Sequence, residues 1–145
     1  MADKTLTAAN SVILLGVTGL YDTPVQLQGF SSDDVFETEA VETAETVMGV
    51  DGTLSAGWIP QAVKQMITLQ ADSDSALIFE NWYQAQRTVQ EVYRAFSTIL
   101  LPGLQRSYTL TRGVLTNVPV TPSAKKIVQP RRFTIVWERV TSAPI

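Results

Sequence analysis

Only one segment of this 145-residue chain has the apolar spacing of a helix, and this restricts the fold more than any other feature. The helix is predicted to begin after Asp72 or Ser73, either of which could cap it, and Glu80, Asn81 and Arg87 point away from its apolar side. That apolar side is the stripe Ile78, Trp82, Ala85 and Val89. A lone amphipathic helix must bury its stripe on another element, so we expect it to pack on a sheet.

The other apolar segments alternate with polar residues or lie between turn signals, which is typical of strands. Strands are predicted at residues 10–17, 25–30, 35–47, 62–70, 95–101, 107–118 and 132–140. The sequence therefore predicts a mainly β protein with a single domain over residues 1–145. Its expected form is a β-sandwich or rolled β-barrel of about seven strands with one flanking helix. Residues 1–10 are an N-terminal arm with little to bury, and residues 48–61 form an extended hairpin loop around an Asp-Gly turn.

The composition disfavours most enzyme classes. The chain has no histidine and no cysteine, so it offers no imidazole base, no thiolate nucleophile and no zinc site built from these ligands. Asp33 and Asp34, with Glu37 and Glu39, could form a carboxylate pair or a calcium site, but adjacent acids at a strand entrance are more often turn residues. We expect no catalytic activity, no cofactor and no metal.

Charge is divided along the chain although the net charge is only −3. Residues 1–63 hold nine acids and one base, whereas residues 87–145 hold nine bases and two acids. Two complementary surfaces would suit a head-to-tail contact between copies. Alternatively, the two halves lie together in space and neutralise each other within one subunit.

The basic cluster consists of Lys125, Lys126, Arg131 and Arg132. Nearby aromatic residues permit a nucleic-acid interpretation, but the acidic chain as a whole argues against it. A contact between subunits explains these charges as well. The aromatics of the last strand alternate as an inward face of Phe133, Ile135 and Trp137, and we expect them in the core.

The order of these segments resembles that of tail tube proteins of contractile-tailed bacteriophages. The resemblance is carried by VQLQGFSSDDVF, the turn segment VMGVDGTLSAG, the strand QMITLQADSDS that leads into the helix, and the closing SAKKIVQPRRFTIVWERV. It also extends to tube proteins of tailocins and to ring proteins of type VI secretion systems. One departure is the loop 52–61, which lacks the charges expected of relatives and contains Trp58 and Pro60.

The resemblance implies a structural virion protein whose subunits form hexameric rings with one continuous inner β-barrel. Rings would stack into a tube that conducts DNA into the host cell, with sheath, baseplate and tail terminator proteins as partners. Genomic DNA would pass without specific binding, and assembly would take place in the host cytoplasm. The alternatives are a tailocin or type VI secretion tube, and a monomeric β-barrel that binds a ligand.

Three sets of residues follow from this interpretation. The lumen is predicted to be lined by residues whose acidic or neutral side chains would not hold DNA phosphates: Glu37, Glu39, Gln26, Gln28, Thr68 and Gln70. Contacts between stacked rings are predicted at Met48, Gly49, Asp51, Trp58 and Ile59. Contacts between subunits are predicted at the basic cluster, which is Lys125, Lys126, Arg131 and Arg132.

Overall fold

The computed structural model describes residues 11–28, 36–121, 124–125 and 127–145. These residues form ten strands, one α-helix and a 3-10 turn, which confirms the predicted mainly β fold with one helix. The N-terminal arm 1–10, Asp33, Asp34 and Lys126 lie outside the described residues. In chain order the elements are β1 Val12–Val17, β2 Tyr21–Gln26, β3 Phe36–Thr38, β4 Ala44–Met48, β5 Leu54–Trp58, β6 Val63–Leu69, α1 Ala76–Val89, β7 Ala95–Leu101, the 3-10 turn Pro102–Leu104, β8 Arg106–Asn117, β9 Arg131–Trp137 and β10 Arg139–Pro144.

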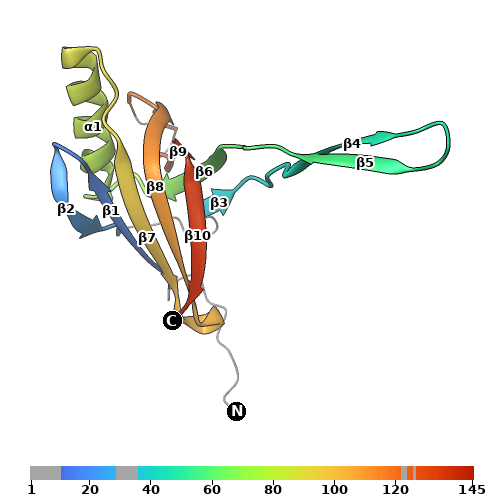
Figure 1. Ribbon diagram of the computed structural model, residues 1–145. Helices are drawn as coiled ribbons and strands as arrows, with labels where there is room; N and C mark the ends of the chain where they lie inside the picture. Colours follow the sequence, from blue (N-terminus) through green and yellow to red (C-terminus); the bar gives the residue numbers. More distant parts are fainter. Residues whose placement is uncertain (1–10, 29–35, 122–123, 126) are drawn as a thin grey trace.

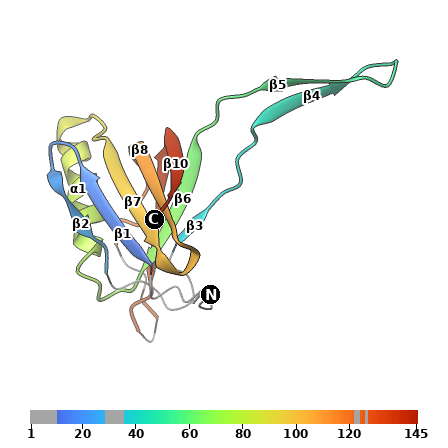
Figure 2. The same ribbon diagram turned by 60° about the horizontal axis from the view of Figure 1, so that its bottom comes forward.

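Eight strands form one open sheet, and the remaining two form a separate hairpin. The sheet order is β2-β1-β7-β8-β9-β6-β3, with β10 paired to the first half of β8, and every described pairing is antiparallel. Helix α1 covers one face of this sheet, while β4 and β5 project far from it (Figures 1 and 2). We call the sheet with α1 the body. We call the hairpin 43–59 the arm, which is not the N-terminal arm predicted at residues 1–10. Within the described residues no helix is long and apolar enough to cross a membrane.

The core lies between α1 and the sheet and is filled with aromatic side chains. Phe79 of α1 stacks on Phe133 of β9 with ring centroids 4.3 Å apart. Trp137 packs against Gly113, where an added Cβ would come within 2.5 Å of the indole ring, and its Nε1 donates to the Gln65 side-chain oxygen at 2.9 Å. The predicted inward face of the last strand is confirmed, since its aromatic residues are fully buried.

The helix begins two or three residues later than predicted. Its N-cap is Ser75, and no side chain forms a capping hydrogen bond. The hydroxyl of Ser75 instead accepts the Gln28 backbone N–H at 2.8 Å, and the hydroxyl of Ser73 donates to the Gln28 carbonyl. These serines tie the turn before α1 to the chain that leaves β2, which explains why Ser73 does not serve as the cap.

Two predicted long strands are each divided. The strand expected at 35–47 becomes β3 and β4 with irregular backbone between them, because β3 pairs with β6 whereas β4 pairs with β5. The strand expected at 132–140 becomes β9 and β10, interrupted at Glu138. Opposite this break, Arg112 of β8 has a positive φ of 53°, and its guanidinium forms an ion pair with Glu138. The strand expected at 25–30 starts earlier, since β2 spans Tyr21–Gln26.

Candidate assembly surfaces

The arm carries large apolar side chains that nothing in the subunit covers. Trp58 is 78% exposed, and Met48, Val47 and Leu54 are also exposed. Every residue of β4 and β5 is exposed, so the hairpin has no contact that buries a face against the body. A two-stranded hairpin alone in water is marginally stable, and its apolar residues would gain burial only against another molecule.

Register sorts the arm into two unlike faces. Cross-strand partners share a face, and one face consists entirely of uncharged residues, in the pairs Ala44 with Trp58, Thr46 with Ala56, and Met48 with Leu54. The opposite face carries Glu45 with Gly57 and Val47 with Ser55. Two of the predicted stacking residues, Met48 and Trp58, therefore lie on the same uncharged and largely apolar face. Ile59 closes the base of the arm through its N–H bond to the Thr43 carbonyl at 3.0 Å.

The tip of the arm is a tight turn, as the Gly-Val-Asp-Gly segment predicts. The Gly52 N–H donates to the Gly49 carbonyl at 3.0 Å, and Gly52 has a φ of +85°, a conformation that favours glycine. The Asp51 carboxylate accepts the Thr53 backbone N–H at 3.0 Å. This hydrogen bond stabilises the charged form and holds the pKa of Asp51 below its ordinary value. The residues at the tip thus serve turn geometry.

The sheet face opposite α1 gathers three of the predicted lumen residues. Glu37 lies opposite Met66, Thr68 opposite Arg132, and Gln26 opposite Leu14, and these partners alternate with the buried residues of their strands. Glu39 is exposed, just beyond β3. Gln28 and Gln70 lie outside the strands. Together with Gln26, the last residue of β2, they line a groove beside the turn that precedes α1. The six residues are therefore spread over two surfaces, and Gln26 belongs to both.

The same sheet face continues over β7, β8 and β10 as a row of neutral hydroxyl groups that sequence reasoning missed. Thr98 pairs with Thr109, which pairs with Thr141 on its other side. Alternation marks each of these positions as facing away from the core, but only the register places them side by side. The far end of this face carries Glu37 and Arg132 as an ion pair at 2.6 Å. The same face also carries two bases, Lys64 opposite Val136 and Arg139 opposite Thr111, so its charge is mixed rather than purely acidic.

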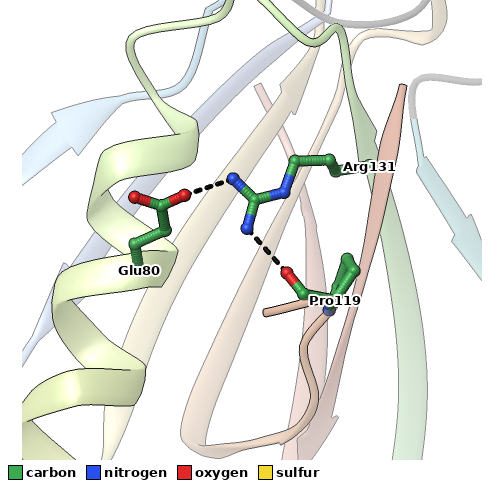
Figure 3. A network of polar contacts seen from close by, with 3 residues as sticks. All are labelled: Glu80, Pro119 and Arg131. Carbon is green, nitrogen blue, oxygen red and sulfur yellow. Dashed lines mark hydrogen bonds and ion pairs between the residues drawn. The ribbon is translucent and has the colours of Figure 1, made fainter. Parts of the chain in front are cut away.

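The basic cluster is divided between the interior and the surface. Arg131 is only 5% exposed: its guanidinium forms an ion pair with Glu80 of α1 and donates to the Pro119 carbonyl at 2.6 Å (Figure 3). The interpretation of Arg131 as a surface contact is therefore replaced by a role inside the subunit. Glu80 therefore contacts the sheet through this ion pair, although the helical pattern predicted that Glu80 would point away from the apolar side of the helix. Arg132 pairs with Glu37, and Lys125 is exposed.

Two of the ion pairs compensate part of the uneven charge along the chain within one subunit. The pairs Arg131 with Glu80 and Arg132 with Glu37 each join the basic C-terminal part to an acid far earlier in the sequence. Neutralisation within one subunit accounts for these charges. In the part of the chain that the structure describes, no group of three or more acidic side chains is arranged to hold a metal ion.

The body and arm together have the fold of subunits found in contractile injection particles. A chain of the sheath-tube complex of an extracellular contractile injection system, PVC, in its extended state, superposes with a TM-score of 0.65 at 13% identity, covering 97% of this chain and 93% of that chain. A chain of the anti-feeding prophage baseplate gives a TM-score of 0.62 at 11% identity, with coverage of 99% and 98%. A chain of the cap that terminates the anti-feeding prophage tube gives 0.61 at 14% identity, with coverage of 100% and 95%.

The expected likeness to tube proteins of such particles is confirmed at the level of the fold. The sequence itself matches the family described as tail fiber protein gp32 over residues 4–141, and the chain belongs to that family. The comparison with curated proteins gives no match.

Proposed function

We propose that this chain is the structural subunit of a contractile tail tube, in which hexameric rings stack into a conduit for DNA. The arm is the observation that carries the proposal. It extends an uncharged apolar face away from the body, and such a face is stabilised only when a second molecule covers it. We infer that a copy of the same subunit covers this exposed face.

The comparisons support a place on the axis of a contractile particle. The three matched chains come from a sheath-tube complex, a baseplate and a tube cap, and each match extends over nearly all of this chain. The family description names a tail fiber, which agrees on the tail but differs on the part. We favour the tube because the whole-chain fold is shared with tube assemblies, and a fibre remains the competing assembly that the shape of the particle would reveal.

Within a ring, the sheet face opposite α1 is the proposed lumen wall. Glu37 and Glu39 provide negative charge there, and Thr68 with Gln26 provides neutral groups. Arg132 offsets the Glu37 charge, and the bases Lys64 and Arg139 lie on the same face, so we assign the lining no strong repulsion of phosphate. DNA would then pass without specific binding.

The remaining roles follow from this assembly. The arm, with Met48 and Trp58 on its apolar face, is the proposed contact between stacked rings, and Lys125 is the basic-cluster residue proposed for contacts between subunits. Sheath, baseplate and terminator proteins are the proposed partners. The location is the virion tail after assembly in the host cytoplasm, and the role is structural rather than catalytic.

The two alternative functions are supported by the structure to different degrees. A tailocin or secretion tube would use the same contacts and differ only in what passes through, so the genes beside this one would separate them. A monomeric ligand-binding barrel is disfavoured, because the described sheet is open and its covered face is filled by Trp82, Trp137 and stacked phenylalanines.

Assembly of the purified protein tests the proposal. Negative-stain microscopy at high concentration should show rings or tubes, and a variant with residues 43–59 replaced by a short Gly-Ser linker should remain a folded monomer. Wild-type protein that stays monomeric at all concentrations would contradict the proposal, and slender fibres without a channel would favour the tail-fibre alternative.

The lumen assignment has its own test. Replacing Glu37 and Glu39 with lysine should leave rings intact and slow DNA ejection from particles that carry the variant, because a basic wall holds phosphates. Ejection at the wild-type rate would reject the placement of these two residues in the lumen.

A further inference from the structure

A groove with acidic and apolar character lies where β2 meets the turn that leads into α1. Val25 and Leu77 line it and are 37% and 56% exposed. Asp72 and Asp74 also line it and are exposed, and neither forms an ion pair within the described residues. No lysine or arginine is among the described residues that line the groove. It therefore offers an apolar surface beside two uncompensated negative charges.

The connection between β8 and β9 has the complementary character. Residues 121–129 contain two lysines and no acid. Ile127 is 73% exposed, Val128 is 47% exposed, and the Lys125 side chain is exposed as well. The Lys125 N–H donates to the Ile127 carbonyl at 3.0 Å, and Ala124 forms a β-bridge with Val128. We call the described residues of this segment, Ala124, Lys125, Ile127 and Val128, the knob.

The knob and the groove lie at the same end of the sheet. Leu69, the last residue of β6, is paired with Arg131, the first residue of β9. The segment that runs from β6 to the groove and the segment that joins the knob to β9 therefore meet the sheet at neighbouring positions. Figure 2 shows the β8-to-β9 connection protruding at the bottom of the view, the side toward which the turn between β6 and α1 also lies.

The knob and the groove are nevertheless separate surfaces of the subunit. The groove runs from β2 to Gln70 and Asp72, which follow β6, whereas the knob leads into β9. No described residue of the β8-to-β9 connection lines the groove. A head-to-tail contact requires such a pair of different surfaces on one chain.

The two ends of the β8-to-β9 connection, which carries the knob, are held together by the buried Arg131. One nitrogen of its guanidinium binds Glu80 of α1 and another binds the carbonyl of Pro119, so both the helix beside the groove and the start of the connection are held to β9 (Figure 3). A partner surface held in place before contact loses less conformational entropy on binding.

We propose that the knob of one subunit binds the groove of a second copy, with Lys125 facing Asp72 and Asp74 while Ile127 and Val128 cover the apolar floor. This proposal rests on the proposed function, because the two copies meet within the ring that the proposed function describes. Complementary charge would select the register between neighbours, and burial of the branched apolar residues would stabilise it.

The absence of native cysteine makes a cross-linking test clean. Two single-cysteine variants, Leu77→Cys and Ile127→Cys, are mixed, allowed to assemble and oxidised. A covalent dimer should form in the mixture and at least about tenfold less in either variant alone, because each variant offers only half of the contact. The matched control replaces Ile127→Cys with Leu104→Cys, an exposed position in the 3-10 turn, and should give no cross-link with Leu77→Cys.

A charge swap tests the same contact without cysteine. Lys125→Glu alone, or Asp72→Lys with Asp74→Lys, should raise the concentration needed for assembly by roughly tenfold, and combining all three should restore it. Rings that form normally in both charge variants and give no cross-link in the mixed-cysteine assay would overturn the proposed contact while leaving the tube function intact. Wild-type protein that forms no assembly would overturn both.

Discussion

The body and the arm use tryptophan in opposite ways. Trp82 and Trp137 are fully buried between α1 and the sheet, whereas Trp58 on the arm is 78% exposed. The body buries its tryptophans in its own core, although some of its apolar side chains, such as Leu77 and Ile127, remain exposed. Within the subunit, the two strands of the arm are joined by backbone hydrogen bonds. The apolar face of the arm is buried only when another molecule covers it. The contrast separates residues that hold the subunit together from residues that we expect to hold subunits to one another.

The largest expected effect comes from truncating a tryptophan in each region. Trp137→Ala should lower the free energy of unfolding by about 3–5 kcal/mol, because it opens a cavity in the core and leaves Gln65 without its partner. Trp58→Ala should change the stability of the monomer by only about 0.5 kcal/mol or less and should abolish assembly. Urea denaturation and sedimentation velocity measure the two quantities. Equal destabilisation by both changes would remove the distinction between body and arm.

Arginine provides a second pair of variants, this time within the body. Arg131→Met should cost about 1–3 kcal/mol, since it leaves the Pro119 carbonyl unpaired and Glu80 partly buried without its cation. Arg132→Met should cost about 0–1 kcal/mol, because its pair with Glu37 is exposed to solvent.

Thermal unfolding followed by circular dichroism would compare the two arginine variants. If Arg132→Met destabilised the protein as much as Arg131→Met, the buried Arg131 would not be the clamp between α1 and β9.

Glycine at the tip provides a smaller effect confined to the arm. Gly52→Ala places a Cβ at a φ of +85° and should weaken the hairpin by about 1 kcal/mol, raising the concentration needed for assembly while the body keeps its stability. Gly57→Ala is the matched control, since an added Cβ there meets no atom within 4 Å. The assembly threshold by light scattering reports both, and an equal shift for the two variants would show that backbone strain at the tip has no role.

The smallest expected effect is the pH dependence of the tip. The Thr53 N–H lowers the pKa of Asp51 from its ordinary value of 3.8, so the contribution of this bond is present above pH 3.8 and is lost as the pH falls through the lower folded-state value. The Thr53 amide shift, followed by NMR during acid titration, should therefore change with a midpoint below pH 3.8. Asp51→Asn should abolish the change. A midpoint at or above 3.8 would show that the hydrogen bond does not favour the carboxylate.

Local patterns in the sequence were sufficient for most of the body. Alternation identified the inward face of β9, and helical spacing identified Ile78 and Trp82 as buried, because burial of one face imposes a period on the chain. Turn chemistry identified the tip of the arm, since few residues other than glycine adopt its backbone conformation.

Contacts between distant segments could not be obtained in this way. Nothing in the residues near Arg131 indicates that Glu80 and Pro119 lie beside its guanidinium, because their meeting depends on how α1 crosses the sheet. The serines before α1 look like caps in sequence, yet they bind the chain after β2. The row of threonines on the face opposite α1 likewise depends on a register that alternation alone leaves open.

Hydrogen exchange of the arm amides, compared between the free subunit and the assembled particle, tests the central claim most directly. The account predicts that amides of β4 and β5 exchange rapidly in the free subunit, while those of β7 and β9 are protected, and that assembly slows the exchange of β4 and β5 strongly. Equally rapid exchange of the arm in both states would contradict the claim that its apolar face joins one subunit to another.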